Sequence, residues 1–161
     1  MITRYSRPEM TAIWEPKNKF QKWLEVELAA CYAHVQLGNI TQEDYDIICE
    51  KASFDVDRIS EIEAEIHHDV IAFLTSVAEF VGPSSRFIHL GLTSTDVVDT
   101  ANALLIQDSG KILLKDIDEL MGKRKNWTRD VIKAHLRDLI TKVDTARAIT
   151  DQDKQEMVDR L

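Results

Sequence analysis

The sequence predicts an all-α protein, and three observations support this fold class. Only three prolines and five glycines occur among 161 residues. No stretch shows the sustained alternation of apolar and polar residues that is typical of strands. Apolar residues instead recur at the spacing of an amphipathic helix along most of the chain. We therefore expect a compact N-terminal helical domain, followed by one long helix and a helical tail.

Helix-starting residues mark the first elements. A proline at the first helical position predicts a short helix over 8–14 and a long one over 16–38. Thr41, with Asp44 three residues later, forms a capping box for the next helix. The apolar stripe of the long helix consists of Phe20, Trp23, Leu24, Leu28, Cys31 and Val35. The acidic pair Glu25 and Glu27 is interpreted as part of its solvated face.

Helical spacing continues through the rest of the chain. It predicts helices over 59–66 and 70–80, a loop at 82–85, and a long helix from Thr93 to about residue 121. In the tail, apolar residues recur at helical spacing, and Thr150 with Asp153 caps a short final helix. These tail residues are Trp127, Val131, Leu136, Leu139, Ile140 and Val143.

The charge distribution indicates a boundary near residue 122. Residues 122–161 carry ten Lys/Arg and seven Asp/Glu, whereas residues 1–121 carry ten and 21. The sign changes where the polar run 122–126 interrupts the apolar periodicity. We therefore expect three parts: an N-terminal helical domain over 1–92, the start of a long helix over 93–121, and a tail of unassigned origin over 122–161.

Composition excludes several classes of function. A formal net charge of -8 argues against a nucleic-acid-binding surface. No apolar run approaches the roughly 18–20 residues that span a bilayer, and the first ten residues lack the apolar segment of a signal peptide. Cys31 and Cys49 have no metal-ligand spacing, so two buried thiols in a reducing cytoplasm are expected.

Residues 89–100, HLGLTSTDVVDT, combine a histidine, a glycine, several hydroxyls and a helix start. Because a helix start offers unpaired N–H groups and a positive dipole end, it attracts anions. Thr93 and Asp96 form a capping box, and the hydroxyls of Thr93 and Ser94 are expected to be free to contact a ligand. His89, on the irregular segment before this helix, could contact a phosphate or carboxylate. The alternative is a well-capped helix beside a surface histidine.

The densest titratable cluster is Glu65-Ile66-His67-His68-Asp69. Adjacent histidines on a helix point about 100° apart and cannot easily share a metal ion, so no metal site is expected. Asp69 could orient the imidazole of His68. The alternative is a pair of polar residues at a helix junction. By contrast, His34 and His135 lie in helical patterns without reactive neighbours and are interpreted as structural.

Near the N-terminus, Arg4 and Tyr5 precede the first helix. An arginine can fork onto a phosphate, and a tyrosine can stack or donate a hydrogen bond. The alternative for Arg4 is a solvated surface charge.

Three segments together resemble the N-terminal part of the adenylosuccinate lyase family, within the fumarase/aspartase superfamily. They are MITRYSRPEMTAIW, EIEAEIHHDVIAF and HLGLTSTDVVDT, and the resemblance covers residues 1 to about 121. It implies a substrate-binding role for Arg4, Tyr5, His67, His68, Asp69, His89, Thr93 and Ser94, with His68 the best candidate for catalytic assistance. His67 stands where the family commonly has Arg or Asn, so its role is the least defined.

The resemblance also implies a reaction. The family removes fumarate by β-elimination from adenylosuccinate and from a related succinylated imidazole-carboxamide ribotide. Such a reaction needs a base, an acid and firm clamps on phosphate and carboxylates. No metal or organic cofactor is implied. The expected partners are the purine nucleotide substrate (adenylosuccinate or AMP), fumarate, and further copies of the chain joined through helices in the cytoplasm.

Two signatures of the family are absent from these 161 residues. One is the Thr-His-Gly type motif that carries the general acid histidine, and the other is a Ser-Ser-x-Met-Pro signature near the catalytic serine. The chain alone is therefore expected to carry a substrate-binding half-site and not to turn over substrate. The alternative is a non-catalytic helical interaction or oligomerisation module derived from the lyase.

Overall fold

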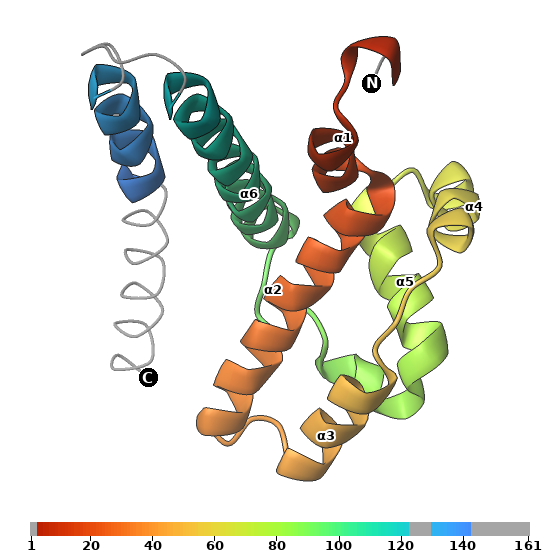
Figure 1. Ribbon diagram of the computed structural model, residues 1–161. Coiled ribbons are helices and arrows are strands. Elements are labelled where there is room, and N and C mark those ends of the chain that lie inside the picture. Colours follow the sequence, from red (N-terminus) through yellow and green to blue (C-terminus); the bar gives the residue numbers. More distant parts are fainter. Residues whose placement is uncertain (1–2, 123–129, 143–161) are drawn as a thin grey trace. The chain divides into compact units, whose positions relative to one another are not determined.

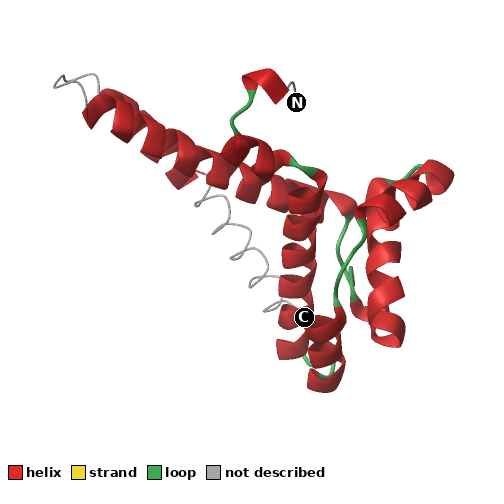
Figure 2. Ribbon diagram, turned by 45° about the vertical axis from the view of Figure 1, so that its right-hand side comes forward, coloured by secondary structure: helices red, strands yellow, loops and turns green. Residues whose placement is uncertain are grey.

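The computed structural model describes residues 3–122 and 130–142, and every regular element in these ranges is a helix (Figures 1 and 2). The all-α prediction is confirmed. A further helix, over 130–142, follows those with labels. In chain order the labelled elements are η1 (Thr3–Tyr5), α1 (Pro8–Trp14), α2 (Pro16–Gln36), α3 (Gln42–Lys51), α4 (Val56–Ile66), α5 (Asp69–Val81), η2 (Gly82–Phe87) and α6 (Ser94–Gly122).

The chain divides into two compact units. One contains residues 15–101, and therefore α2 to η2 with the first two turns of α6. The other contains residues 1–14 and 102–161, and therefore α1 and the remainder of α6. We call them the central unit and the terminal unit. None of the described helices is both long and apolar enough to cross a membrane.

The predicted helix boundaries follow from local chemistry. α2 begins at a proline, which cannot donate a hydrogen bond and loses nothing at a helix start. Beyond its end, Gly38 takes a positive φ of 74°, which a glycine adopts without steric cost. The Thr41 hydroxyl accepts a hydrogen bond from the Asp44 N–H at 3.1 Å, so the capping box of α3 is confirmed.

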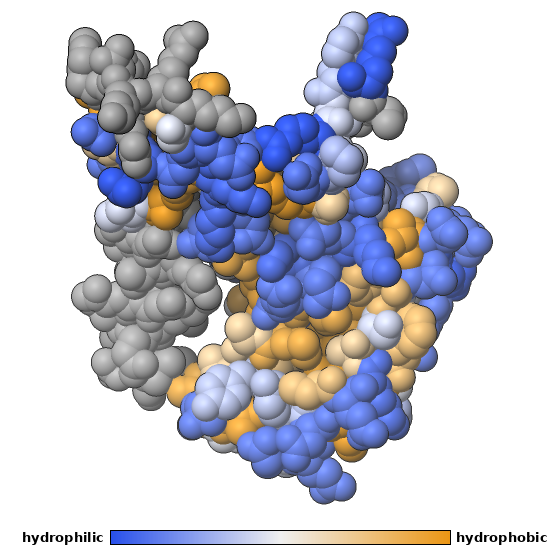
Figure 3. All heavy atoms as spheres, viewed as in Figure 1, coloured by the Kyte–Doolittle hydropathy of each residue, from blue (hydrophilic) through white to orange (hydrophobic). Residues whose placement is uncertain are grey.

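An aromatic cluster forms the centre of the central unit. The rings of Phe20 and Phe73 stack with centroids 5.7 Å apart, and Trp23 meets both rings edge-on. All three are buried, and they join α2 to α5. Deleting one such ring costs about 3–5 kcal/mol, so this cluster fixes how the two helices pack. In Figure 3, apolar side chains show between α2, α3 and α5 among hydrophilic ones.

Two local expectations are wrong. Residues 82–85 are not an irregular loop but belong to η2, whose tight turns start at Gly82-Pro83, where proline presets the required backbone angle. The second concerns the thiols: Cys31 is buried as expected, but Cys49 is exposed. The Cys31 Sγ donates to the Phe87 carbonyl oxygen at 3.6 Å, which ties α2 to the end of η2.

In the terminal unit, the helix over 130–142 packs on α6. A Cβ at Gly110 would lie 3.5 Å from Ile140 Cγ1, so the two helices approach closely at this glycine. Asp118 and Lys133 form an ion pair between them, and Asp116 pairs with Arg7 ahead of α1. The predicted helical spacing is thus confirmed over 130–142. Trp127, Val143 and the cap at Thr150 lie outside the described residues.

Candidate functional site

His89 lies on the link between η2 and α6, and its backbone is left-handed. Its φ is 66°, an uncommon conformation for a residue with a side chain, although histidine adopts it more often than most. Gly91, two residues later, also has a positive φ of 72°. The Leu92 N–H donates to the His89 carbonyl at 3.3 Å and closes the turn. We call residues 88–94 the His89 corner.

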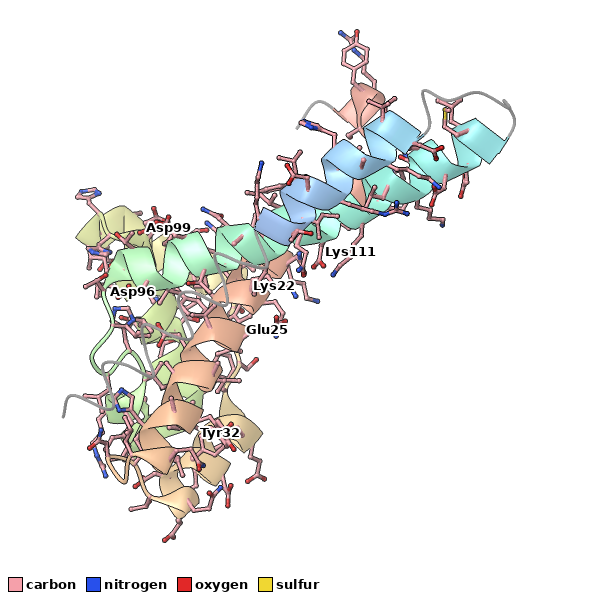
Figure 4. All side chains as sticks on the ribbon, turned by 90° about the vertical axis from the view of Figure 1, so that its left-hand side faces the viewer. Lys22, Glu25, Tyr32, Asp96, Asp99 and Lys111 are labelled. Atoms are coloured by element: carbon pink, nitrogen blue, oxygen red, sulfur yellow. The ribbon has the colours of Figure 1, made fainter. Side chains whose placement is uncertain are left out.

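A buried glutamate holds this corner. Glu27, on α2, is 0% exposed, and its Oε2 accepts the backbone N–H of His89 at 2.8 Å. Its Oε1 lies 2.6 Å from the Nδ1 of the same histidine. Burial raises the pKa of Glu27, and the hydrogen bonds and charge of His89 oppose that rise. The interpretation of Glu27 as part of a solvated face is therefore wrong, whereas its neighbour Glu25 is exposed and pairs with Lys22 (Figure 4).

Sequence reasoning missed Glu27, although a signal was present. On α2 the buried positions are 20, 23, 24, 27 and 31, which is the spacing of a single apolar stripe. Glu27 stands in the middle of that stripe, three residues after Leu24 and four before Cys31. A charged residue on an apolar stripe requires a buried partner, and only the fold reveals that the partner is His89.

His34, predicted to be structural, also fixes the His89 corner. Its Nε2 lies 2.8 Å from the Leu90 carbonyl oxygen, and its Nδ1 lies 3.1 Å from the Asn39 side-chain nitrogen. Because a carbonyl only accepts, Nε2 carries the proton and donates. Two side chains of α2, one turn pair apart, therefore hold the backbone and the ring of this corner in place.

At the start of α6, the capping box differs from the expected form. The Asp96 carboxylate accepts both the Thr93 N–H at 2.7 Å and the Thr93 hydroxyl at 2.9 Å. The hydroxyl of Thr93 is thus not free, contrary to expectation, because the short Asp side chain reaches back to it. Ser94 is the first residue of α6 and is half-buried. Figure 4 shows Asp96 and Asp99 on the first turns of α6.

His67, His68 and Asp69 form the junction of α4 and α5, which we call the His68 corner. His67 ends α4 in the left-handed conformation, with φ 54°. His68 is the N-cap of α5, and its Nδ1 accepts the Ile71 N–H at 3.4 Å. All three residues are exposed, and Asp69 Oδ1 lies 3.8 Å from His68 Nδ1. An accepting Nδ1 carries no proton, so in the neutral ring the proton of His68 lies on Nε2.

The structure brings the predicted residues together in separate groups. His67, His68 and Asp69 hydrogen-bond within α4 and α5, whereas the 89–94 segment bonds to α2 and α6. Arg4 and Tyr5 belong to the terminal unit, where both are exposed and the Arg4 guanidinium lies 4.7 Å from the Tyr5 ring centroid. Across residues 3–122 and 130–142, no group of three metal-ligating side chains is arranged to hold a metal ion.

An all-α fold with these corners is characteristic of a helical lyase. A family model described as Lyase matches residues 3–136, and the chain belongs to this family. Two solved structures share its fold. They are a fumarate lyase from Mesorhizobium sp. BNC1, with a TM-score of 0.68 over 88% of this chain and 41% of that one, and a β-carboxy-cis,cis-muconate cycloisomerase from Acinetobacter calcoaceticus sp. ADP1, with a TM-score of 0.64 over 86% and 40%. They are 15% and 17% identical to it.

Curated relatives narrow the similarity to one enzyme. Adenylosuccinate lyase from Bacillus subtilis (strain 168) is 53% identical over 130 residues, which are 81% of this chain and 30% of the relative. Adenylosuccinate lyase from Streptococcus mutans serotype c is 51% identical over 122 residues, 76% of this chain and 28% of the relative. The resemblance predicted from the sequence is confirmed. The chain spans less than a third of the length of these relatives.

Proposed function

We propose that this chain forms the N-terminal, substrate-binding part of an adenylosuccinate lyase. The reaction is a β-elimination: a base takes a carbon-bound proton from the succinyl group, the C–N bond breaks, a C=C bond forms in fumarate, and the departing nitrogen receives a proton. Adenylosuccinate and the succinylated imidazole-carboxamide ribotide are the proposed substrates. We place the reaction in the cytoplasm, in an enzyme assembled from several copies through helices.

One observation carries this proposal. Sequence identity of 53% extends over 130 residues to a curated adenylosuccinate lyase, a level far above that of the structural neighbours. At this identity the relatives share more than a helical framework, because packing alone permits many sequences for one fold. The geometry of the two histidine corners supports the same function.

The His89 corner is suited to bind an anion. Because its Nδ1 faces a buried carboxylate, the ring offers only Nε2 to a ligand, and that nitrogen donates a proton when the ring is cationic. Ser94 and the first N–H groups of α6 add donors at the positive end of a helix dipole. We assign this corner, with Thr93 as its cap, to a phosphate or carboxylate of the substrate.

The His68 corner is suited to proton transfer. Its Nδ1 accepts a hydrogen bond from the backbone, so the proton on Nε2 is available to a departing nitrogen. We assign His68 to catalytic assistance, and Asp69 and His67 to substrate contact beside it. Arg4 and Tyr5 are assigned to the nucleotide, for which a guanidinium and an aromatic ring provide charge and stacking.

A chimeric enzyme tests the proposal. Residues 1–121 of this chain replace the matching segment of the Bacillus subtilis relative, and fumarate release from adenylosuccinate is measured. We expect activity within about tenfold of the parent and a loss of about 100-fold or more after His68→Ala. His135→Ala in the 161-residue chain is the matched histidine control for AMP binding. A correctly folded chimera without activity would overturn the proposal.

The isolated chain gives a second test. Because the Thr-His-Gly and Ser-Ser-x-Met-Pro signatures are absent from its sequence, we expect no fumarate release but saturable AMP binding by calorimetry. Fumarate release by the chain alone would contradict the half-site interpretation.

A helical interaction module is the alternative, and one feature of the terminal unit favours it. An apolar groove of about 300 Å³ is lined mainly by Trp14, residues 106–113 of α6, and Leu136, Leu139 and Ile140. Such a surface suits an apolar helix of a partner. Association with a partner protein, without any binding of AMP, would support this alternative over the lyase.

A further inference from the structure

The Glu27–His89 pair is a charged contact that the sequence motifs do not contain. Glu27 comes from α2, 62 residues before His89, and its carboxylate is completely buried. A buried carboxylate without a partner is strongly unfavourable, and many residue types at this position would pack with less cost. The core of the central unit needs no acid here, because the other large buried side chains of α2 are apolar or aromatic.

Both carboxylate oxygens are directed at one residue. Oε2 accepts the backbone N–H of His89 at 2.8 Å and Oε1 contacts its ring at 2.6 Å. The first contact fixes the left-handed backbone, and the second fixes the rotation of the ring and the position of its proton. The side chain of His89 retains 18% exposure while the carboxylate has none, so its accessible edge is the one opposite Glu27.

We infer that Glu27 is the positioning residue for His89: its carboxylate holds the Nδ1 proton and turns Nε2 outward as a donor to the substrate anion. The carboxylate also balances the positive charge of the imidazolium, which lets the ring remain cationic while half-enclosed by protein. Glu27 itself touches no substrate. This inference rests on the proposed function only in the identity of the anion.

The first test needs no ligand and no variant. The 161-residue chain is produced with ¹⁵N-labelled histidine, and long-range ¹H–¹⁵N spectra report which ring nitrogen of His89 carries a proton. We expect Nδ1 to be protonated. A wild-type spectrum in which Nδ1 of His89 is unprotonated would overturn the inference, whether or not the chain binds nucleotide.

The second test compares two glutamates of α2. In Glu27→Gln we expect the Nδ1 signal of His89 to move toward that of a free imidazole, while Glu25→Gln, which alters an exposed residue of the same helix, leaves it unchanged. Circular dichroism confirms folding of each variant. An unchanged His89 spectrum in folded Glu27→Gln would contradict the positioning role.

AMP binding then separates positioning from a purely structural effect. We expect Glu27→Gln to weaken AMP binding by about tenfold, as loss of a charge-assisted arrangement predicts. In a His89→Ala background the same substitution should have no further effect, because the group that it positions is gone. Equal weakening in both backgrounds would overturn the inference. If the wild-type chain binds no AMP, the proposed function fails while the spectra still decide the role of Glu27.

Discussion

The two histidine corners of the central unit share a backbone conformation but differ in how they are held. His67 has φ 54° and His89 has φ 66°, yet the first is exposed and the second is fixed by a fully buried carboxylate. The His68 corner makes its hydrogen bonds locally, whereas the His89 corner is joined to α2 across more than 50 residues of sequence. One corner is therefore preformed, and the other depends on contacts from a ligand or from further chain.

The largest expected effect comes from removing the buried acid. Glu27→Ala leaves the His89 N–H without its acceptor and creates a cavity, so we expect the free energy of unfolding to fall by about 3 kcal/mol. His68→Ala, at the exposed corner, should cost only about 0.5–1 kcal/mol because it removes one weak cap. Urea denaturation measures both, and equal losses would remove the distinction between the corners.

Glycine substitution at the two left-handed histidines should give opposite signs. His67→Gly relieves the unfavourable conformation and should raise the free energy of unfolding by about 0.5 kcal/mol. His89→Gly relieves the same conformation but leaves the Glu27 carboxylate without its ring partner, so a net loss of about 1–2 kcal/mol is expected. Thermal unfolding of both variants is the measurement. A gain in stability at both positions would mean that the buried pair contributes nothing.

Gly91 tests the backbone of the His89 corner alone. With φ 72°, Gly91→Ala places a side chain in the left-handed region and should cost about 1 kcal/mol, although the new Cβ would lie an acceptable 3.7 Å from His34 Nε2. Gly110→Ala is the matched control, because this helical glycine has ordinary angles and alanine there should be stabilising by up to about 1 kcal/mol. Calorimetric melting of the two variants would reveal any departure from these opposite signs.

The smallest effect depends on pH and concerns η2, which leads into the His89 corner. The hydroxyls of Ser84 and Thr41 donate to Asp44 and hold its pKa below the usual value. A lowered native pKa means that the stabilisation is present above the unfolded pKa and is lost as the pH falls through the native one. The stability difference between wild type and Asp44→Asn should thus be greatest above about pH 5 and should shrink toward pH 3. A difference independent of pH would show that Asp44 acts without its charge.

Much of the fold could be predicted from the sequence because helix starts and apolar stripes are local signals. Pro16 and the Thr41 cap predict their helices within a residue or two. The positions of Thr93 and His89 at a helix entrance were also predictable. The partners of these residues were not: Asp96 occupies the Thr93 hydroxyl, and Glu27 meets His89 only after α2 and the 88–94 segment pack together. Side-chain pairing across long separations is set by tertiary structure rather than by periodicity.

The two thiols give this protein an internal chemical reporter. Burial first, and the nearby Glu27 charge second, raise the pKa of Cys31 to about 12, whereas Cys49 is exposed on α3. Because the thiolate is the reactive form, a disulfide reagent should modify Cys49 at once and Cys31 only when the α2–η2 contact opens. The rate of the slow reaction then measures how often the scaffold behind His89 comes apart, without any label or mutation.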